Sequence, residues 1–128
     1  MSDLLEAARD ARERAHAPYS RFKVGAAVQD DTGQIFSGCN IENATYGLTI
    51  CAERVAIFKA VSEGARKFRR LSVVADTASL TPPCGACRQI IWEFCGDIEI
   101  CLANLSGKTE TLQMRDLFPR AFDDSFLA

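Results

Sequence analysis

The stretch that decides the fold is residues 71–96, LSVVADTASLTPPCGACRQIIWEFCG. Its start, Leu71 to Ala75, is an apolar run of the kind found in a central strand with both faces covered. A pair of prolines then leads into a helix, which we expect from about Cys84 to Phe94, with Gly96 at its C-terminal end. The stretch therefore predicts a strand inside a sheet, followed by a helix that packs against the sheet.

Both flanks of this stretch add further helices and strands. On the N-terminal side, apolar periodicity and turn residues predict a helix, a two-stranded hairpin and a second helix, at about Asp3–His16, Phe22–Val28, Gln34–Cys39 and Cys51–Glu63. On the C-terminal side we expect two strands and a short helix, at about Ile98–Leu102, Thr109–Met114 and Arg115–Phe118. This order predicts an α/β fold, a three-layer α/β/α sandwich with a mixed five-stranded sheet. The length of 128 residues fits a single domain over residues 1–128.

The charge balance argues against two classes of partner. The chain has 15 Lys and Arg against 17 Asp and Glu, so it lacks the excess of basic residues that is typical of proteins that bind nucleic acid. The longest stretch without a charged residue runs from Thr77 to Cys87, which falls short of the ~18 apolar residues of a membrane span. We therefore expect a protein that binds neither nucleic acid nor a membrane.

The chain has six cysteines and a single histidine. The first residues, MSDLLE, lack the basic and apolar regions of a signal peptide, so we expect a cytoplasmic location with reduced cysteines. The one histidine, His16, excludes an HExxH zinc site, and we expect it at the C-terminal end of the first helix, close to the helix dipole. Any chemistry must then depend on Cys, Glu, Asp or backbone groups.

The motif from Cys84 to Cys87, preceded by Pro83, is the most specific local signal. A CxxC at the start of a helix fits a thioredoxin-type redox pair, half of a structural zinc site, or part of a catalytic zinc site with three protein ligands. The first needs a βαβ context near the N-terminus, the second needs another CxxC or two histidines, and the chain has neither. Cys51, at the start of the other long helix, can supply the third ligand of a catalytic site.

The surroundings of these three cysteines fit thiolates bound to zinc. A helix N-terminus stabilises an anion. Each helix also carries an arginine at helical spacing from its first cysteine, Arg54 or Arg88, and we expect both guanidinium groups to hydrogen-bond to the sulfurs. Glu53 taken alone is an ordinary first-turn glutamate. Between Cys51 and a downstream PCxxC, it matches the signature of zinc nucleobase deaminases.

Four segments together resemble the small, zinc-dependent cytidine deaminases. They are APYSRFKVGAA (17–27), GCNIENA (38–44), CAER (51–54) and PCGACRQ (83–89), and the resemblance extends over nearly the whole chain. It implies hydrolytic deamination of cytidine and 2'-deoxycytidine to uridine and 2'-deoxyuridine, with release of ammonia, in pyrimidine salvage. It also implies a homotetramer whose active sites are shared between subunits.

The resemblance further implies roles for individual residues. One zinc ion per subunit would be held by Cys51, Cys84 and Cys87, with Glu53 as the general acid and base. The ribose 3'-hydroxyl would be hydrogen-bonded by Asn40 and Glu42. The other substrate contacts that it implies are Phe22 on the pyrimidine, Ala52, Ala44 and Tyr46 from a neighbouring subunit, and Phe122 lent by another subunit.

Two alternatives stay open at this point. A deaminase of the same fold that acts on blasticidin S or another aminopyrimidine nucleoside would share CAE and PCxxC, although the segment 40–43 favours the ordinary nucleoside. A zinc-stabilised interaction module would need a fourth ligand, for which Cys39 is the candidate. We expect Cys101 to lie in the core and Cys95 to lie too far along its helix to reach the metal.

Overall fold

The computed structural model describes residues 2–127, and its elements follow the expected order. In chain order they are α1 (Ser2–Arg12), β1 (Val24–Asp30), β2 (Ile35–Cys39), η1 (Tyr46–Leu48), α2 (Ala52–Ser62), β3 (Phe68–Ala75), α3 (Gly85–Cys95), β4 (Glu99–Ala103), β5 (Thr109–Gln113), α4 (Met114–Leu117) and η2 (Asp124–Phe126). The two 3₁₀ turns, η1 and η2, left no signal in the sequence, because three residues are too few to show a periodicity.

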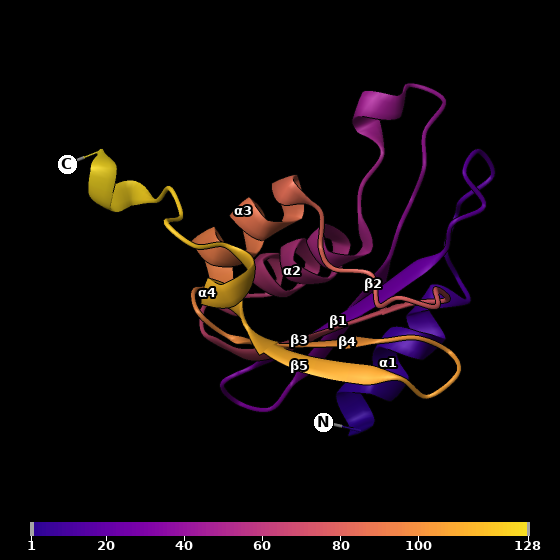
Figure 1. The fold of residues 1–128 in the computed structure, drawn as a ribbon. Coiled ribbons are helices and arrows are strands. Elements are labelled where there is room, and N and C mark those ends of the chain that lie inside the picture. Colours follow the sequence, from indigo (N-terminus) through magenta and orange to yellow (C-terminus); the bar gives the residue numbers. More distant parts are fainter. Residues whose placement is uncertain (1, 128) are drawn as a thin grey trace.

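The strands form one mixed sheet in the order β2-β1-β3-β4-β5. Within residues 2–127, β3 pairs with β4 in parallel, whereas β1 with β2, β1 with β3 and β4 with β5 pair antiparallel. Helices α2 and α3 cover one face of the sheet and α1 covers the other, so the predicted three-layer α/β/α arrangement is confirmed (Figure 1). Among residues 2–127, no helix has the length and apolar character needed to cross a membrane.

The two faces of the sheet bury separate apolar clusters. The larger one lies under α2 and α3 and includes Ile57, Ile91 and Val73. The smaller one lies under α1 and includes Leu4 and Val74. Strand β3 thus contributes neighbouring residues to both clusters, which explains why its C-terminal part, Leu71 to Ala75, is apolar except for Ser72.

Two glycines allow the helices to lie directly on the sheet. A Cβ atom on Gly25 would overlap the carbonyl oxygen of Ala8 in α1, and one on Gly38 would lie 2.6 Å from the backbone nitrogen of Ala56 in α2. Gly38 therefore faces α2. Because successive residues of a strand point to opposite faces, Cys39 faces the side of the sheet that α1 covers.

The N-terminal helix is shorter than expected. It ends at Arg12, so the prediction that His16 lies at the end of this helix is wrong. His16 instead forms a β-bridge with Ile41: its amide donates to the carbonyl of Asn40 at 3.0 Å, and its carbonyl accepts from the amide of Glu42 at 2.8 Å. These long-range backbone bonds draw the chain out of the helix and beside the segment that follows β2.

Candidate metal centre and substrate cavity

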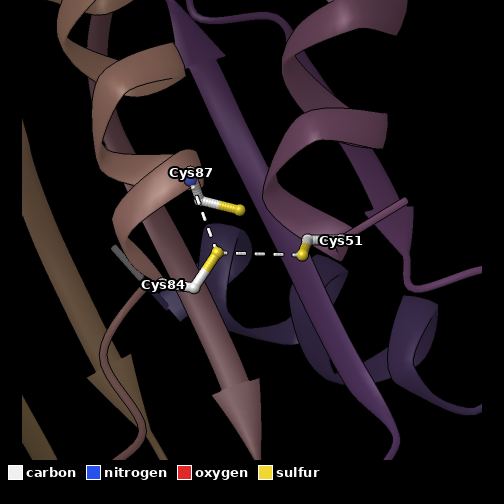
Figure 2. A group of neighbouring side chains, drawn as sticks. All are labelled: Cys51, Cys84 and Cys87. Atoms are coloured by element: carbon white, nitrogen blue, oxygen red, sulfur yellow. Dashed lines mark hydrogen bonds between the residues drawn. The ribbon is translucent and has the colours of Figure 1, made fainter. Parts of the chain in front are cut away.

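Three cysteine side chains from the starts of two helices converge on one point (Figure 2). The Sγ atoms of Cys51, Cys84 and Cys87 all lie within 4.8 Å of one another, and those of Cys51 and Cys84 are 4.0 Å apart. Three sulfurs bound at about 2.3 Å to a tetrahedral zinc ion would lie roughly 3.8 Å from each other. The donor type and the spacing therefore both fit zinc, and among residues 2–127 no fourth candidate ligand joins the three sulfurs.

The local backbone explains why these side chains point together. Cys51 and Cys84 are the N-cap residues of α2 and α3, each with an extended backbone that turns its side chain toward the first turn of the helix. The amide of Cys87, in the first turn of α3, donates to the Sγ of Cys84 at 3.4 Å. Free amides and the positive end of the helix dipole both favour a thiolate at these positions.

Arg54 adds a positive charge beside the sulfurs. Its Nη2 donates to the Sγ of Cys51 at 3.2 Å. The pKa of Cys51 falls to about 5, chiefly because its sulfur interacts with the Cys87 thiol and also because of Arg54. The same interaction with Cys51, together with burial, raises the pKa of Cys87. Because a thiolate is the form that binds a metal, metal binding at these cysteines would release protons.

The other arginine does not make the contact that we expected. Arg88 directs its Nε to the carbonyl of Pro83 at 2.8 Å and its Nη1 to the carbonyl of Leu117 at 2.7 Å. The prediction of a hydrogen bond from this guanidinium to a sulfur is therefore wrong. The reason is tertiary: the end of α4 presents a carbonyl oxygen within reach, so Arg88 ties the start of α3 to α4 instead.

The remaining cysteines lie apart from the metal centre. Cys39 faces the α1 side of the sheet, whereas the sulfur cluster lies on the side of α2 and α3. Cys101 is buried, as expected, and Cys95 is a mostly buried thiol whose pKa burial raises to about 12. Within residues 2–127, the metal-binding group contains only Cys51, Cys84 and Cys87, so the fourth thiol that a closed structural site requires is not in reach.

Glu53 lies beside this centre, in the first turn of α2. Its side chain is only 5% exposed, and it lines a cavity of about 160 Å³ together with Cys51 and Cys84. Burial, with a smaller contribution from the charge of Cys51, raises the pKa of Glu53 to about 7. A carboxyl group with this pKa can both accept and donate a proton near neutral pH.

Two cavities, called inner and outer below, share Thr49 in their linings. The inner one, which holds Glu53, is lined by expected residues that include Phe22, Asn40 and Ala52. The outer one, of about 390 Å³, contains Glu42 and Tyr46, and Thr49 lines both. Most of the expected substrate residues therefore line one or the other of these two cavities, and Tyr46, expected from a neighbouring subunit, lines the outer cavity of its own chain.

The polar residues of these cavities hold the backbone of the segment before β1. Asn40 accepts a hydrogen bond from the amide of Val24 at 2.9 Å and donates one to the carbonyl of Phe22 at 2.7 Å. Glu42 accepts from the amides of Tyr19 and Ser20 at 2.9 and 3.1 Å and from the Ser20 hydroxyl. These bonds, first of all that of the Ser20 hydroxyl, lower the pKa of Glu42.

Ala44, Tyr46 and Phe122 lie in segments that project from the body of the molecule (Figure 1). The ring of Tyr46 is 75% exposed and meets that of Tyr19 edge-on at 6.1 Å. Phe122 is 54% exposed, and its ring stacks on that of Phe126 with the ring centroids 5.7 Å apart. Within this chain, neither Ala44 nor Phe122 lines the two cavities.

Several cavity residues had not been singled out from the sequence. Tyr19 and Ser20 lie inside the segment APYSRFKVGAA, so the motif marked their region but not their contacts. Thr49, Thr81 and Pro82 also line the cavities. They carry no signal of their own, because they lie in irregular loops next to the cysteine motifs.

Comparison with known proteins gives one consistent result. The family model described as "Cytidine and deoxycytidylate deaminase zinc-binding region" matches residues 1–102. The cytidine deaminase of Sporosarcina psychrophila is 51% identical over 98% of this chain and 93% of its own length, and that of Halalkalibacterium halodurans is 52% identical over 93% and 91%. The crystal structure of cytidine deaminase from Burkholderia pseudomallei superposes with a TM-score of 0.91 at 48% identity, covering 94% of this chain and 98% of that one.

Proposed function

Since this chain belongs to the cytidine and deoxycytidylate deaminase family of zinc-dependent hydrolases that act on C–N bonds, we propose that it removes the 4-amino group of cytidine and 2'-deoxycytidine. Water is consumed, and the products are ammonia and uridine or 2'-deoxyuridine. The observation that carries the proposal is the buried carboxyl of Glu53, which lines a cavity together with two of the three converging cysteines. The blasticidin S alternative is not favoured, because relatives with about half of their residues identical are cytidine deaminases.

Cys51, Cys84 and Cys87 would hold the zinc ion. When bound there, zinc lowers the pKa of a water molecule, so that the water can attack C4 of the base. The carboxylate of Glu53 accepts the proton that this water loses and delivers it to N3 of the pyrimidine. Glu53 then takes the second proton of that water from the hydroxyl group now on C4 and passes it to the 4-amino nitrogen. The C4–N bond breaks, ammonia leaves, and the oxygen on C4 becomes the carbonyl of the product. A raised pKa and a buried position suit the same carboxyl for both transfers.

Asn40 and Glu42 offer a hydrogen-bond donor and a hydrogen-bond acceptor for a hydroxyl group of the sugar. After its contacts to the backbone, the Asn40 amide keeps one N–H free, and Glu42 keeps about one acceptor position of roughly four. A single hydroxyl can accept a hydrogen bond from Asn40 and donate one to Glu42. The 3'-hydroxyl, which ribose and deoxyribose share, fits this pairing. Phe22 would then pack on the pyrimidine, with Ala52 in the wall of the inner cavity.

We also propose a homotetramer in which neighbouring subunits complete each site. The exposed rings of Tyr46 and Phe122 support it, because large apolar side chains on projecting segments are typical of interaction surfaces. Ala44 and Tyr46 would come from one neighbour and Phe122 from another. A Glu53→Gln variant mixed with a Phe122→Ala variant should then regain activity, since some sites of a mixed tetramer would contain both native residues. Inactive mixtures of subunits that do exchange would contradict shared sites.

The setting that we propose is pyrimidine salvage in the cytoplasm, by a single domain spanning residues 1–128. The six cysteines among the described residues are all unpaired, which suits a reducing compartment. The net charge of -2 gives no attraction to nucleic acid. The partner would be a free nucleoside.

Ammonia release from cytidine tests this function directly. Protein loaded with zinc should release ammonia from cytidine and from 2'-deoxycytidine, and a chelator should abolish the reaction until zinc is restored. Blasticidin S serves as the competing substrate. Deamination of blasticidin S alone would support the alternative enzyme, and no ammonia from any substrate by zinc-loaded protein would support an interaction module.

A further inference from the structure

The segment from Tyr19 to Val24 carries Phe22 to the cavity, although it has no regular secondary structure before Val24. Side-chain hydrogen bonds fix it at both ends. Glu42 binds the amides of Tyr19 and Ser20 at one end, and Asn40 binds the backbone of Phe22 and Val24 at the other. The two residues proposed to receive the sugar therefore also hold the residue proposed to receive the base.

Ser20 connects the two parts of this arrangement. Its hydroxyl donates to Oε2 of Glu42 and accepts a hydrogen bond from the amide of Phe22 at 3.0 Å. With its donor and one of its two acceptor positions in use, the hydroxyl bridges the carboxylate and the backbone that carries the aromatic ring. Tyr19 reaches Glu42 only through its amide, so Ser20 is the residue whose side chain makes the link.

The backbone next to Ser20 is unusual. Arg21 has a φ of 61°, in the left-handed region that residues other than glycine rarely occupy. Its amide donates to the carbonyl of Ala17 at 2.9 Å, which closes the turn. Such a conformation persists only where surrounding contacts hold it, and the hydrogen bond from the Phe22 amide to Ser20 is one of these contacts.

We propose that Ser20 is a positioning residue for the nucleoside. Its hydroxyl fixes the Glu42 carboxylate and the Phe22 ring relative to each other, so that the sugar and the base are received in one geometry. Ser20 acts through these two neighbours, and the inference rests on the substrate contacts proposed above for Phe22 and Glu42. Glu53 and the cysteines make none of these contacts, so the chemical step should not depend on Ser20.

Ser20→Ala removes the hydroxyl and Ser20→Thr keeps it. Loss of a hydrogen bond to a charged acceptor should raise KM for cytidine roughly tenfold and leave kcat within a factor of about two. The threonine variant should restore a nearly native KM. Thr32→Val is the matched control, because the hydroxyl and amide of Thr32 bind Oδ1 of Asp30 in the same way, in the turn between β1 and β2. This variant should leave KM unchanged.

A second comparison separates this inference from the proposed function. Glu42→Gln should raise KM, and adding Ser20→Ala to it should raise KM less than Ser20→Ala does alone, because the two residues act together. A native KM for Ser20→Ala beside a raised KM for Glu42→Gln would overturn the role of Ser20 and leave the substrate site intact. A native KM for Glu42→Gln would overturn the substrate site itself. A loss of kcat and thermal stability in Ser20→Ala without a change in KM would indicate a merely structural residue.

Discussion

The sulfur atoms of Cys51 and Cys84 lie 4.0 Å apart although 33 positions separate the two residues in the chain. The connection between them explains this proximity. Helix α2 leads back to the start of β3, and α3 begins after the end of β3, so both helices start at the same edge of the sheet. The metal centre is therefore a consequence of the topology, and no rearrangement of the chain is needed to bring its thiols together.

Replacing single cysteines tests the three-thiolate site. Cys84→Ser should lose zinc, because the hydroxyl of serine is a much poorer ligand than a thiolate. Cys39→Ser is the matched control and should bind as much zinc per chain as the native protein, since Cys39 faces the opposite side of the sheet. Zinc content per chain, measured by atomic absorption after gel filtration, checks both. Loss of zinc from Cys39→Ser would show that the centre has a fourth thiol ligand.

Replacing Glu53 separates metal binding from proton transfer. Glu53→Gln keeps the shape of the side chain but cannot carry a proton, so kcat should fall by roughly 10²- to 10⁴-fold while zinc stays bound. Glu93→Gln, on the exposed side of α3, makes the same chemical change away from the cavity and should leave both kcat and the zinc content unchanged. Steady-state kinetics and zinc analysis give the result. Near-native turnover by Glu53→Gln would contradict its role.

The two arginines should respond differently to the same substitution. Arg54→Gln removes the charge that donates to Cys51, so zinc affinity or activity should fall by roughly 10- to 100-fold. Arg88→Gln removes two bonds to backbone carbonyls and should lower stability by about 1–2 kcal/mol with zinc affinity unchanged. Competition with a zinc-binding dye and thermal melts distinguish the two. Equal effects on zinc affinity would contradict the separate roles.

The cysteine motifs could be located on the fold from the sequence, because strong local signals surround them. Apolar periodicity and terminal glycines define α2 and α3, and this placed Cys51 and Cys84 at helix starts before any contact was known. The position of Cys39 relative to the site could not be derived from the sequence. Alternation along β2 shows that Cys39 and its neighbours face opposite sides of the sheet, but not which side holds the metal centre. Which helix covers each face of the sheet depends on tertiary packing, which the local sequence of a strand does not record.

The hydrogen-bond partners of polar side chains such as those of Arg88 and Ser20 could not be predicted from the sequence. Arg88 can reach a sulfur by helical spacing, but the carbonyl of Leu117, 29 positions away in the chain, competes for it. Ser20 gives the opposite case: the motif includes it, yet its link between Glu42 and Phe22 depends on how the segment after β2 lies against the segment before β1. Such contacts arise from packing between elements, which periodicity does not record.

The close approach of α2 to the sheet can be tested at Gly38. Gly38→Ala places a Cβ atom 2.6 Å from the backbone nitrogen of Ala56 and 2.9 Å from Cβ of Val55, so α2 must move outward. We expect a loss of about 1–3 kcal/mol of stability and weaker zinc binding, because α2 carries Cys51. Gly47→Ala, where an added Cβ has open space, is the control. Denaturant unfolding of the two variants checks this, and equal stability would contradict the close contact.

The C-terminal tail is fastened to α3 by a small number of bonds. The indole Nε1 of Trp92 donates to Oδ2 of Asp123 at 3.3 Å, and Nε2 of Gln89 donates to the carbonyl of Phe122 at 3.0 Å. Asp123 also caps η2 through the amide of Ser125. The tail therefore presents Phe122 from a fixed anchor while its rings stay exposed.

Removing one of these bonds should loosen the tail without unfolding the protein. Trp92→Phe keeps an aromatic ring but loses the N–H, so about 1 kcal/mol of anchoring is lost and the tail opens roughly five times as often. Trypsin cleavage after Arg120 should accelerate by a similar factor, while the melting temperature stays nearly native. Glu93→Gln, the next position on the same helix, should be cleaved at the native rate. An unchanged rate for Trp92→Phe would show that the bond to Asp123 does not hold the tail. If Phe122 serves a neighbouring site, as proposed above, KM for cytidine should rise together with the cleavage rate.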